Sequence, residues 1–370
     1  MSVLHICCNL AGSTVFPQMF EALRAAGLEQ TVFVPEKHAG NIGKNAPEGV
    51  PAVWAQTVRP SDALLFFRKA QRSVPAIERD VDLRGVTLVH AHTLFTDGGI
   101  ANALYRRRGI PYVVTLRYSD IEVIWRWEPH LRPMARRILA DARRVIFLSS
   151  SARDKVLSAW LRGGAREAVA AKAAVIPNGI LPGWLDGTPR TAPGDPVRVG
   201  FAGRMNRRKR PLDALGAVHA ASDAGGRRYV LRACGEGPLR ERLEQALRPG
   251  DESLGRVQGM EAMKRFYAGC DVLLVPSSAE TFGMVYLEAM SQGVPVLYTR
   301  GQGFDGQLPE GEAGYAVVCG DIAQQAQALE RILQGYAQRS ARCIERAQAY
   351  AWPTVAQRWL ALYRAAEMKE

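Results

Sequence analysis

Apolar runs and amphipathic stretches alternate along most of the chain. Each run is short, rich in valine, leucine and isoleucine, and closed by a polar or glycine-containing turn. Such runs are typical of parallel strands buried on both faces, and the stretches between them have helical periodicity. The pattern predicts an α/β fold with strands at residues 3–8, 31–35, 86–90, 110–116, 145–150, 174–177, 197–202, 229–234, 256–259, 272–275 and 294–298, and another near Val53.

Residues 272–296 have the clearest pattern. An apolar strand that ends at Val275 precedes a polar turn and a helix that contains Met284, and Gly293 ends this helix before the next strand. The turn therefore follows the carboxyl end of a predicted parallel strand, which is where open α/β sheets bind ligands. The N-terminus of the helix favours an anion.

Two glutamates bracket this helix N-terminus, Glu280 in the turn and Glu288 within the helix. A diphosphate fits the free N–H groups of Thr281, Phe282 and Gly283. Ionised carboxylates only accept hydrogen bonds, so they suit sugar and ribose hydroxyls. The alternative is that Glu280 is solvated and Glu288 lies on an exposed helix face.

Two further loops have the form of phosphate sites. The loop from Gly203 to Lys209 is basic and joins a strand to a helix, and Arg204 lies near its start. A second small-residue turn, at Gly12 and Ser13, follows the first strand. Backbone N–H groups and cationic side chains in such loops bind phosphate.

The sequence around the two glutamates resembles that of a known family. Pro276-Ser-Ser-Ala-Glu280-Thr-Phe-Gly283 and Glu288-Ala-Met-Ser-Gln-Gly-Val-Pro-Val296 are similar to the Glu-x7-Glu motif of retaining glycosyltransferases with the GT-B architecture, family 4 (glycosyl transferases group 1). The resemblance implies two Rossmann-like domains whose parallel sheets face each other across a cleft.

The resemblance also implies roles for individual residues. It gives Glu280, Arg204 and Lys209 catalytic roles, with the last two on the donor diphosphate. It adds donor contacts at Gly12, Ser13, Gly203, Met260, Thr281, Phe282, Gly283, Met284 and Glu288. Gly301-Gln-Gly303-Phe-Asp-Gly306 resembles the family's glycine-rich loop over the donor.

The acceptor side departs from the family. Its members commonly have a histidine where this chain has Arg117, which stays protonated and cannot act as a base. We expect Arg117 to hold an anionic group, with Asp120 as its nearest carboxylate. Similarity to the family implies that His90 or His92 lines the cleft.

We expect neither a metal nor a cofactor. His90-Ala-His92 has no evident third ligand, and Asp80-Val-Asp82 precedes a strand and reads as surface.

The best linker is the Pro/Gly-rich stretch that begins at Pro177-Asn178-Gly179. The expected domains are an acceptor-binding domain at residues 1–178 and a nucleotide-sugar-binding domain at 179–352. In the family, a C-terminal helix such as 353–370 crosses back to the first domain.

Charge adds a membrane hypothesis. The net charge is +12, and residues 1–180 carry 24 Lys and Arg against 15 Asp and Glu, a surplus of +9. Trp125 and Trp127 lie among arginines, which suits an anionic membrane or a lipid-linked acceptor. The alternative is that one face of the segment that contains Trp125 and Trp127 packs on the domain core. No nucleic-acid-binding signature is present.

The cysteines form no Cys-x-x-Cys pair, and the N-terminus has no signal-peptide pattern. We therefore expect a cytoplasmic protein. If the positive charge binds an anionic membrane, the protein lies at the inner face of that membrane.

Taken with the resemblance, these features predict a metal-independent retaining enzyme. It would transfer a hexose from a nucleotide diphosphate sugar, a UDP-sugar above all, to a glycan or lipid-linked acceptor in bacterial surface polysaccharide synthesis. Two alternatives are a nucleotide-sugar epimerase of the same fold and a non-catalytic nucleotide-sugar-binding partner.

Overall fold

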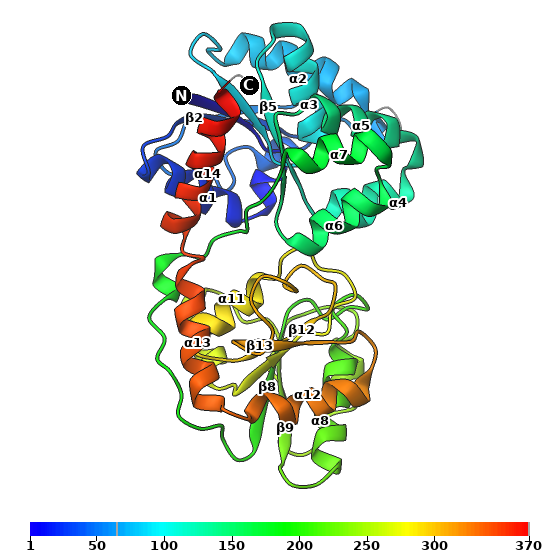
Figure 1. Ribbon diagram of the computed structural model, residues 1–370, viewed down its shortest axis with the longest axis vertical. Helices are drawn as coiled ribbons and strands as arrows, with labels where there is room; N and C mark the ends of the chain where they lie inside the picture. Colours follow the sequence, from blue (N-terminus) through cyan, green and yellow to red (C-terminus); the bar gives the residue numbers. More distant parts are fainter. Residues whose placement is uncertain (64–65, 369–370) are drawn as a thin grey trace. The chain divides into compact units, whose positions relative to one another are not determined.

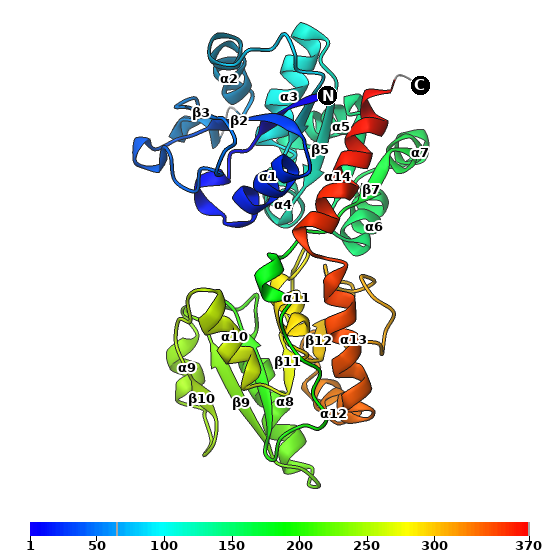
Figure 2. The ribbon, with the colours of Figure 1, turned by 90° about the vertical axis from the view of Figure 1, so that its left-hand side faces the viewer.

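The computed structural model describes residues 1–63 and 66–368 and has two compact units (Figures 1 and 2). Unit 1 comprises Met1–Leu148, Ala152–Gly179 and the C-terminal segment from Trp352. Unit 2 comprises Ser149–Ser151 and Ile180–Ala351. Within the described ranges, none of the helices combines the length and apolar character needed to cross a bilayer.

Unit 1 is built on a seven-stranded sheet in which every strand pair is parallel. Its spatial order is β3-β2-β1-β4-β5-β6-β7. The strands are β1 (Ser2–Ile6), β2 (Glu29–Pro35), β3 (Ala52–Ala55), β4 (Leu88–Ala91), β5 (Tyr112–Leu116), β6 (Arg144–Phe147) and β7 (Ala173–Val175). The α/β class and the parallel pairing are as predicted.

Helices cover both faces of this sheet. The larger apolar core lies between the sheet and α2 (Phe67–Asp80), α3 (Thr96–Arg108), α5 (Arg132–Asp141), α6 (Ser150–Ala159) and α7 (Gly163–Ala171). The other face packs against α1 (Val15–Ala25) and α14 (Trp352–Glu367), which lie side by side in both views (Figures 1 and 2). The C-terminal helix therefore completes the first unit.

The segment after β5 is divided into short helical pieces. A π-helical turn (Ser119–Ile124), α4 (Trp125–Trp127) and a 3-10 turn (Pro129–Leu131) precede α5. Proline has no N–H and disfavours continued helix before it, so Pro129 accounts for the interruption. Pro133 lies in the first turn of α5, where proline is tolerated. Trp125 stacks on Trp160 at 3.9 Å between ring centroids, whereas Trp127 is 70% exposed. One tryptophan therefore packs on the unit and the other faces solvent.

Unit 2 has a six-stranded parallel sheet in the order β10-β9-β8-β11-β12-β13. Helices α8 and α12 pack together (Figure 1), and α11 packs against both α10 and α13. The strands are β8 (Val197–Ala202), β9 (Tyr229–Cys234), β10 (Glu252–Ser253), β11 (Val272–Leu274), β12 (Val296–Thr299) and β13 (Gly314–Val317). The helices are α8 (Pro211–Asp223), α9 (Arg240–Glu244), α10 (Met260–Ala268), α11 (Met284–Ser291), α12 (Ile322–Leu333) and α13 (Tyr336–Gln348).

The strand expected at residues 256–259 is wrong. The edge strand of this sheet is β10 instead, which pairs with β9. Gly255 precedes the expected segment and Gly259 is its last residue, with φ of +64° and +83°. These positive values take the backbone out of the extended region.

Each sheet has one point where the strand order reverses. It lies between β1 and β4 in unit 1 and between β8 and β11 in unit 2. Ligands of doubly wound sheets bind beyond the carboxyl ends of the strands at such a switch point. The loops after these four strands are therefore the places to look for function.

Candidate functional site

An ion pair joins the two loops at the switch point of unit 2. Lys209, from the loop after β8, donates through Nζ to Oε2 of Glu280, from the loop after β11. The two side chains are 11% and 15% exposed. Two of the three residues expected to be catalytic, Lys209 and Glu280, thus meet at the place where the fold favours a ligand.

Backbone bonds hold these two loops against each other. The N–H of Ser278 donates to the carbonyl of Arg208 at 2.8 Å, and Arg208 Nη1 donates to the carbonyl of Ala279 at 3.2 Å. Lys209 is further fixed because its N–H donates to Asn206 Oδ1 at 3.0 Å. The ion pair therefore joins two braced loops.

The glycine-rich loop packs directly on the Glu280 turn. Gly303 N–H donates to the Glu280 carbonyl at 2.8 Å, and Glu280 N–H donates to Gln302 Oε1 at 3.0 Å. A Cβ at Gly303 would lie 2.1 Å from the carbonyl carbon of Thr281, so a larger residue requires the loops to separate. This close approach fixes the backbone of Glu280 from both sides.

Unbonded amides follow Glu280. In the described part of the chain, the N–H groups of Thr281, Phe282 and Gly283 have no hydrogen-bond acceptor, and α11 begins immediately afterwards at Met284. Gly283 has φ of +91°, a conformation that turns the chain into the helix. The structure thus provides the donors and helix N-terminus that an anion needs.

Arg204 is an exposed cation in the loop after β8 and has no ion-pair partner among the described residues. It follows Gly203, whose φ is +145°. Lys209 and Arg204 therefore differ: the first is neutralised by Glu280, and the second is free to meet an incoming anion.

Glu288 lies half-buried on α11, where its Oε2 accepts a hydrogen bond from the Tyr267 hydroxyl at 2.9 Å. Burial raises the pKa of this carboxyl, and the bond from Tyr267 lowers it by less. Its Oε1 has no donor among the described residues, so it can accept one more hydrogen bond. Met260, which was also expected to contact the nucleotide-sugar donor, is half-buried at the start of α10.

The switch point of unit 1 contains a buried acid that sequence reasoning missed. Asp97, in the first turn of α3, accepts from the Cys8 N–H at 3.0 Å through Oδ1, while its buried Oδ2 has no hydrogen-bond partner among the described residues. Loss of hydration raises the pKa of Asp97 to about 7. The turn at Gly12 and Ser13, which was expected to bind phosphate, follows Cys8 closely in the sequence. Gly12 lies in a 3-10 turn, and Ser13 Oγ accepts a hydrogen bond from the Val15 N–H at 3.3 Å.

Arg117 and Asp120 meet through the backbone rather than as an ion pair. Asp120 Oδ2 accepts from the Arg117 N–H at 2.9 Å, and Oδ1 accepts from the Phe95 N–H at 3.3 Å. The Arg117 guanidinium donates instead to the His92 carbonyl at 3.0 Å and lies 4.4 Å from the centre of the Phe16 ring. Burial raises the pKa of Asp120 to about 6. Asp120 therefore braces two strand-end loops.

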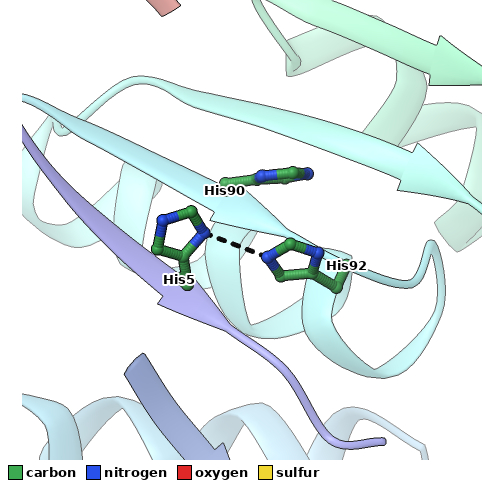
Figure 3. A group of neighbouring side chains, drawn as sticks. All are labelled: His5, His90 and His92. Carbon is green, nitrogen blue, oxygen red and sulfur yellow. Dashed lines mark hydrogen bonds between the residues drawn. The ribbon is translucent and has the colours of Figure 1, made fainter. Parts of the chain in front are cut away.

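His90 and His92 do not fit the expected place on a cleft, because both side chains are fully buried. Residues two apart on a strand share a face, and His5 on β1 stands beside His90 in the register (Figure 3). His5 Nδ1 and His92 Nε2 are 3.0 Å apart, as the dashed line shows. Both ring nitrogens of His90 already have hydroxyl partners, at 2.7 Å from Tyr363 and 2.8 Å from Thr115.

The three imidazoles are candidate ligands by type, with one nitrogen of each within 4.8 Å of the others. Burial lowers the pKa of His5 to about 3 and those of His90 and His92 well below the usual value. The neighbouring Arg117 charge lowers the pKa of His90 and His92 further, and it would also repel a cation. The cluster is therefore a core of neutral rings, and the expectation of no metal stays a prediction.

Two family models match the chain. The first, described as "Glycosyl transferases group 1", matches residues 188–350, and the second, described as "Glycosyl transferase 4-like domain", matches residues 11–179. Together they span most of both units.

Individual proteins agree with this. A D-inositol 3-phosphate glycosyltransferase of Saccharomonospora viridis is 32% identical over 191 residues, or 47% of this chain and 44% of that protein. The chain thus matches less than half of this relative. One from Frankia alni is 27% identical over 94% of this chain and 92% of that protein. The solved structure of Anabaena Alr3699/HepE in complex with UDP-glucose has a TM-score of 0.70 at 17% identity, covering 99% and 100% of the two chains, which shows the same fold.

Replacing Asp97 by Asn tests the buried acid through pH. Between about pH 4, the pKa of an unfolded Asp, and about pH 7, folded Asp97 keeps a proton that the unfolded chain releases. This group therefore makes the free energy of unfolding fall as pH rises through that window, by up to about 1.4 kcal/mol per pH unit. Asn has no proton to release, so Asp97→Asn should gain stability relative to the parent from pH 4 to pH 7 in urea titrations.

The control is Asp82→Asn. Asp82 is on the surface, and its hydrogen bond to Arg84 lowers its pKa to about 2. Both the folded and the unfolded chain are then ionised at this residue above about pH 4, so Asp82→Asn should gain no stability with rising pH. A stability difference between Asp97→Asn and the parent that does not change with pH would contradict the assignment.

Proposed function

Because this chain belongs to the glycosyl transferases group 1 family and has the GT-B fold, we propose that it transfers a hexose from a nucleotide diphosphate sugar to a hydroxyl group. The preferred donor is a UDP-sugar, and the acceptor is a glycan or a lipid-linked sugar. The anomeric configuration is retained. The observation that carries the proposal is the Lys209–Glu280 pair beside the unbonded amides at the switch point of unit 2.

The diphosphate is held by charge and by the backbone. Its oxygens accept from the N–H groups of Thr281, Phe282 and Gly283, and Arg204 and Lys209 offset its negative charge. Lys209 changes partner in part, because the phosphate competes with Glu280 for its three N–H donors. Preorganised donors directed at charge that develops in the transition state contribute most to such reactions.

Glu280 acts on the transferred sugar. Freed from part of its bond to Lys209, the carboxylate accepts from a sugar hydroxyl and orients the ring. The bond from the anomeric carbon to the phosphate oxygen breaks, and the acceptor oxygen bonds to that carbon on the same face. The departing phosphate oxygen takes the acceptor proton, so no side-chain base is required and Arg117 does not prevent the reaction.

Glu288 serves the other end of the donor. Tyr267 occupies one of its oxygens, and the second accepts from a ribose hydroxyl. This contact is the same in the ground and transition states, so it contributes to nucleotide affinity rather than to turnover.

Unit 1 recognises the acceptor and makes peripheral contact with an anionic membrane. The support is the +9 charge of residues 1–180 and the exposed Trp127, which has an Arg126 guanidinium 5.2 Å from the centre of its ring. Aromatic and cationic side chains together favour the bilayer interface.

The first prediction concerns the two cations. Arg204→Ala and Lys209→Ala should each weaken nucleoside diphosphate binding by about 1.5–3 kcal/mol, the range of a hydrogen bond to a charged group. Arg207→Ala is the matched control, because Arg207 is an exposed arginine of the same loop with no assigned role. Isothermal titration with UDP measures all three, and parent affinity in both test variants would exclude this diphosphate site.

The second prediction is that turnover needs no divalent metal. A panel of nucleotide sugars is screened by thermal stabilisation, since a donor at one hundred times its Kd adds about 2.7 kcal/mol. Transfer from the best donor is then measured with and without EDTA, and the anomeric configuration of the product is read by NMR. Activity that EDTA abolishes and Mg²⁺ or Mn²⁺ restores would contradict metal independence.

The same assays separate the alternative functions. Isomerisation of the donor in the absence of acceptor would indicate an epimerase, and donor binding without turnover would indicate a non-catalytic partner.

The third prediction separates the two glutamates. Glu280→Gln keeps the shape of the side chain and removes its charge, so turnover should fall strongly while UDP affinity changes little. Glu288→Gln should change UDP affinity more than Glu280→Gln does. Transfer by Glu280→Gln at the parent rate would remove the main chemical support for the proposal.

A further inference from the structure

A groove in unit 1 runs along α3 between α2 and α5 and has a volume of about 450 Å³. This size is within the roughly 300–1,000 Å³ of small-ligand pockets. Its walls come from Phe66, Val74, Met134 and Ile138. It belongs to unit 1 alone and includes none of the residues assigned above to donor or acceptor.

The groove exists because α3 has small side chains on the face that forms its floor. Thr96, Gly99 and Ala103 lie on one face, at the spacing of successive helical turns, and all three line the groove. A Cβ at Gly99 would meet no atom within 4 Å, whereas one at Gly98 would lie 3.0 Å from Ile138. Gly99 therefore opens on empty space, while its neighbour is closed against the core.

The two ends of the groove differ in chemistry. Lys69 on α2 donates to Thr96 on α3 at 3.3 Å, so the two helices begin at the same end, where Phe66 and the 52% exposed Phe67 lie. At the other end α3 finishes with Arg106 and Arg107, and Arg137 of α5 also lines the groove. Among the described residues that line it, none is acidic.

These arginines retain donors for an anion. Arg106 uses Nη2 on Asp141 at 3.2 Å, and Arg107 uses Nε on Glu78 at 2.8 Å, with the two arginine side chains 55% and 61% exposed. Arg137 is exposed and has no ion pair in the described structure. A guanidinium has five N–H donors in a planar fork that suits phosphate.

We propose that this groove binds an anionic phospholipid of the bilayer, with one acyl chain along Gly99 and Ala103 and the phosphate on Arg106, Arg107 and Arg137. An apolar channel with cations at one end matches an apolar chain with an anion at one end. This deepens the membrane contact proposed above and does not depend on the transfer reaction. It also gives that contact a defined site rather than a diffuse basic surface.

The test fills the groove without disturbing the fold. Gly99→Leu places a side chain in the open space and replaces glycine by a better helix former, so the unit should remain folded. Gly164→Leu in α7 is the matched control, since its Cβ also meets no atom within 4 Å and it does not line the groove. Arg137→Gln tests the phosphate end, with the exposed Arg166 of α7 changed to Gln as its control.

Binding is measured by co-sedimentation with vesicles of phosphatidylcholine alone or with phosphatidylglycerol. Gly99→Leu should weaken binding to the acidic vesicles by more than about tenfold, since two displaced methylene groups already correspond to that factor. Arg137→Gln should weaken it about fivefold and reduce its salt dependence. Neither control should change binding.

Two outcomes would overturn the proposal. One is parent-like binding of Gly99→Leu to acidic vesicles, which would leave only a diffuse electrostatic contact. The other is self-association of the parent that Gly99→Leu abolishes while vesicle binding persists, which would assign the groove to a second copy. UDP titration of the same variants reports on the donor site separately, so failure here is distinguishable from failure of the transferase proposal.

Discussion

The ion pair between Lys209 and Glu280 is the interaction on which the proposed donor site depends. Each charge comes from a different strand-end loop, and the two side chains are largely shielded from water. Removing one partner of such a pair leaves the other without compensation, which costs more than the pair itself contributes. The pair thus holds the Glu280 side chain in place before a donor arrives. In the proposed reaction, a diphosphate takes over part of the Lys209 charge and releases Glu280 toward the sugar.

Close backbone approaches make this arrangement possible. Gly303 lets one loop lie against Thr281, and Gly235 lets the loop after β9 lie against the carbonyl of Gly203, where a Cβ would be 1.9 Å away. In unit 1 the strand ends are fixed differently, by buried polar groups. Neutral imidazoles of low pKa resist protonation, and Asp97 and Asp120 have raised pKa values and resist ionisation. Folding therefore opposes charge at the first switch point and organises it at the second.

Local pattern was sufficient where a feature is local. The bounds of β8 and β9 are as predicted because apolar runs and turn residues determine them. The placement of Glu280 in a turn and Glu288 in a helix follows from Gly293 and the helix formers before it. Features made by distant residues were missed. His5 joins His90 and His92 only through strand pairing, and Gln302 reaches Glu280 only because Gly303 permits close packing. A polar residue inside an apolar strand is the one signal that pointed to His5.

Burial explains the remaining differences. His90 lies near the end of β4 and His92 directly after it, a position that predicted cleft residues. Helices α1 and α14 instead cover that face of the sheet with Phe16, Phe20 and Trp359. That cover comes partly from the far end of the chain, which no local window contains. Asp120 is the nearest carboxylate to Arg117 in the sequence, but its oxygens accept from the backbone N–H groups of Arg117 and Phe95.

The most direct test of the donor site is amide hydrogen exchange with and without UDP. The N–H groups of Thr281, Phe282 and Gly283 have no acceptor in the described structure, so a bound diphosphate should slow their exchange. The account predicts protection in the segments spanning residues 280–286 and 203–210. Protection confined to unit 1, or absent from both of these segments at saturating UDP, would contradict it.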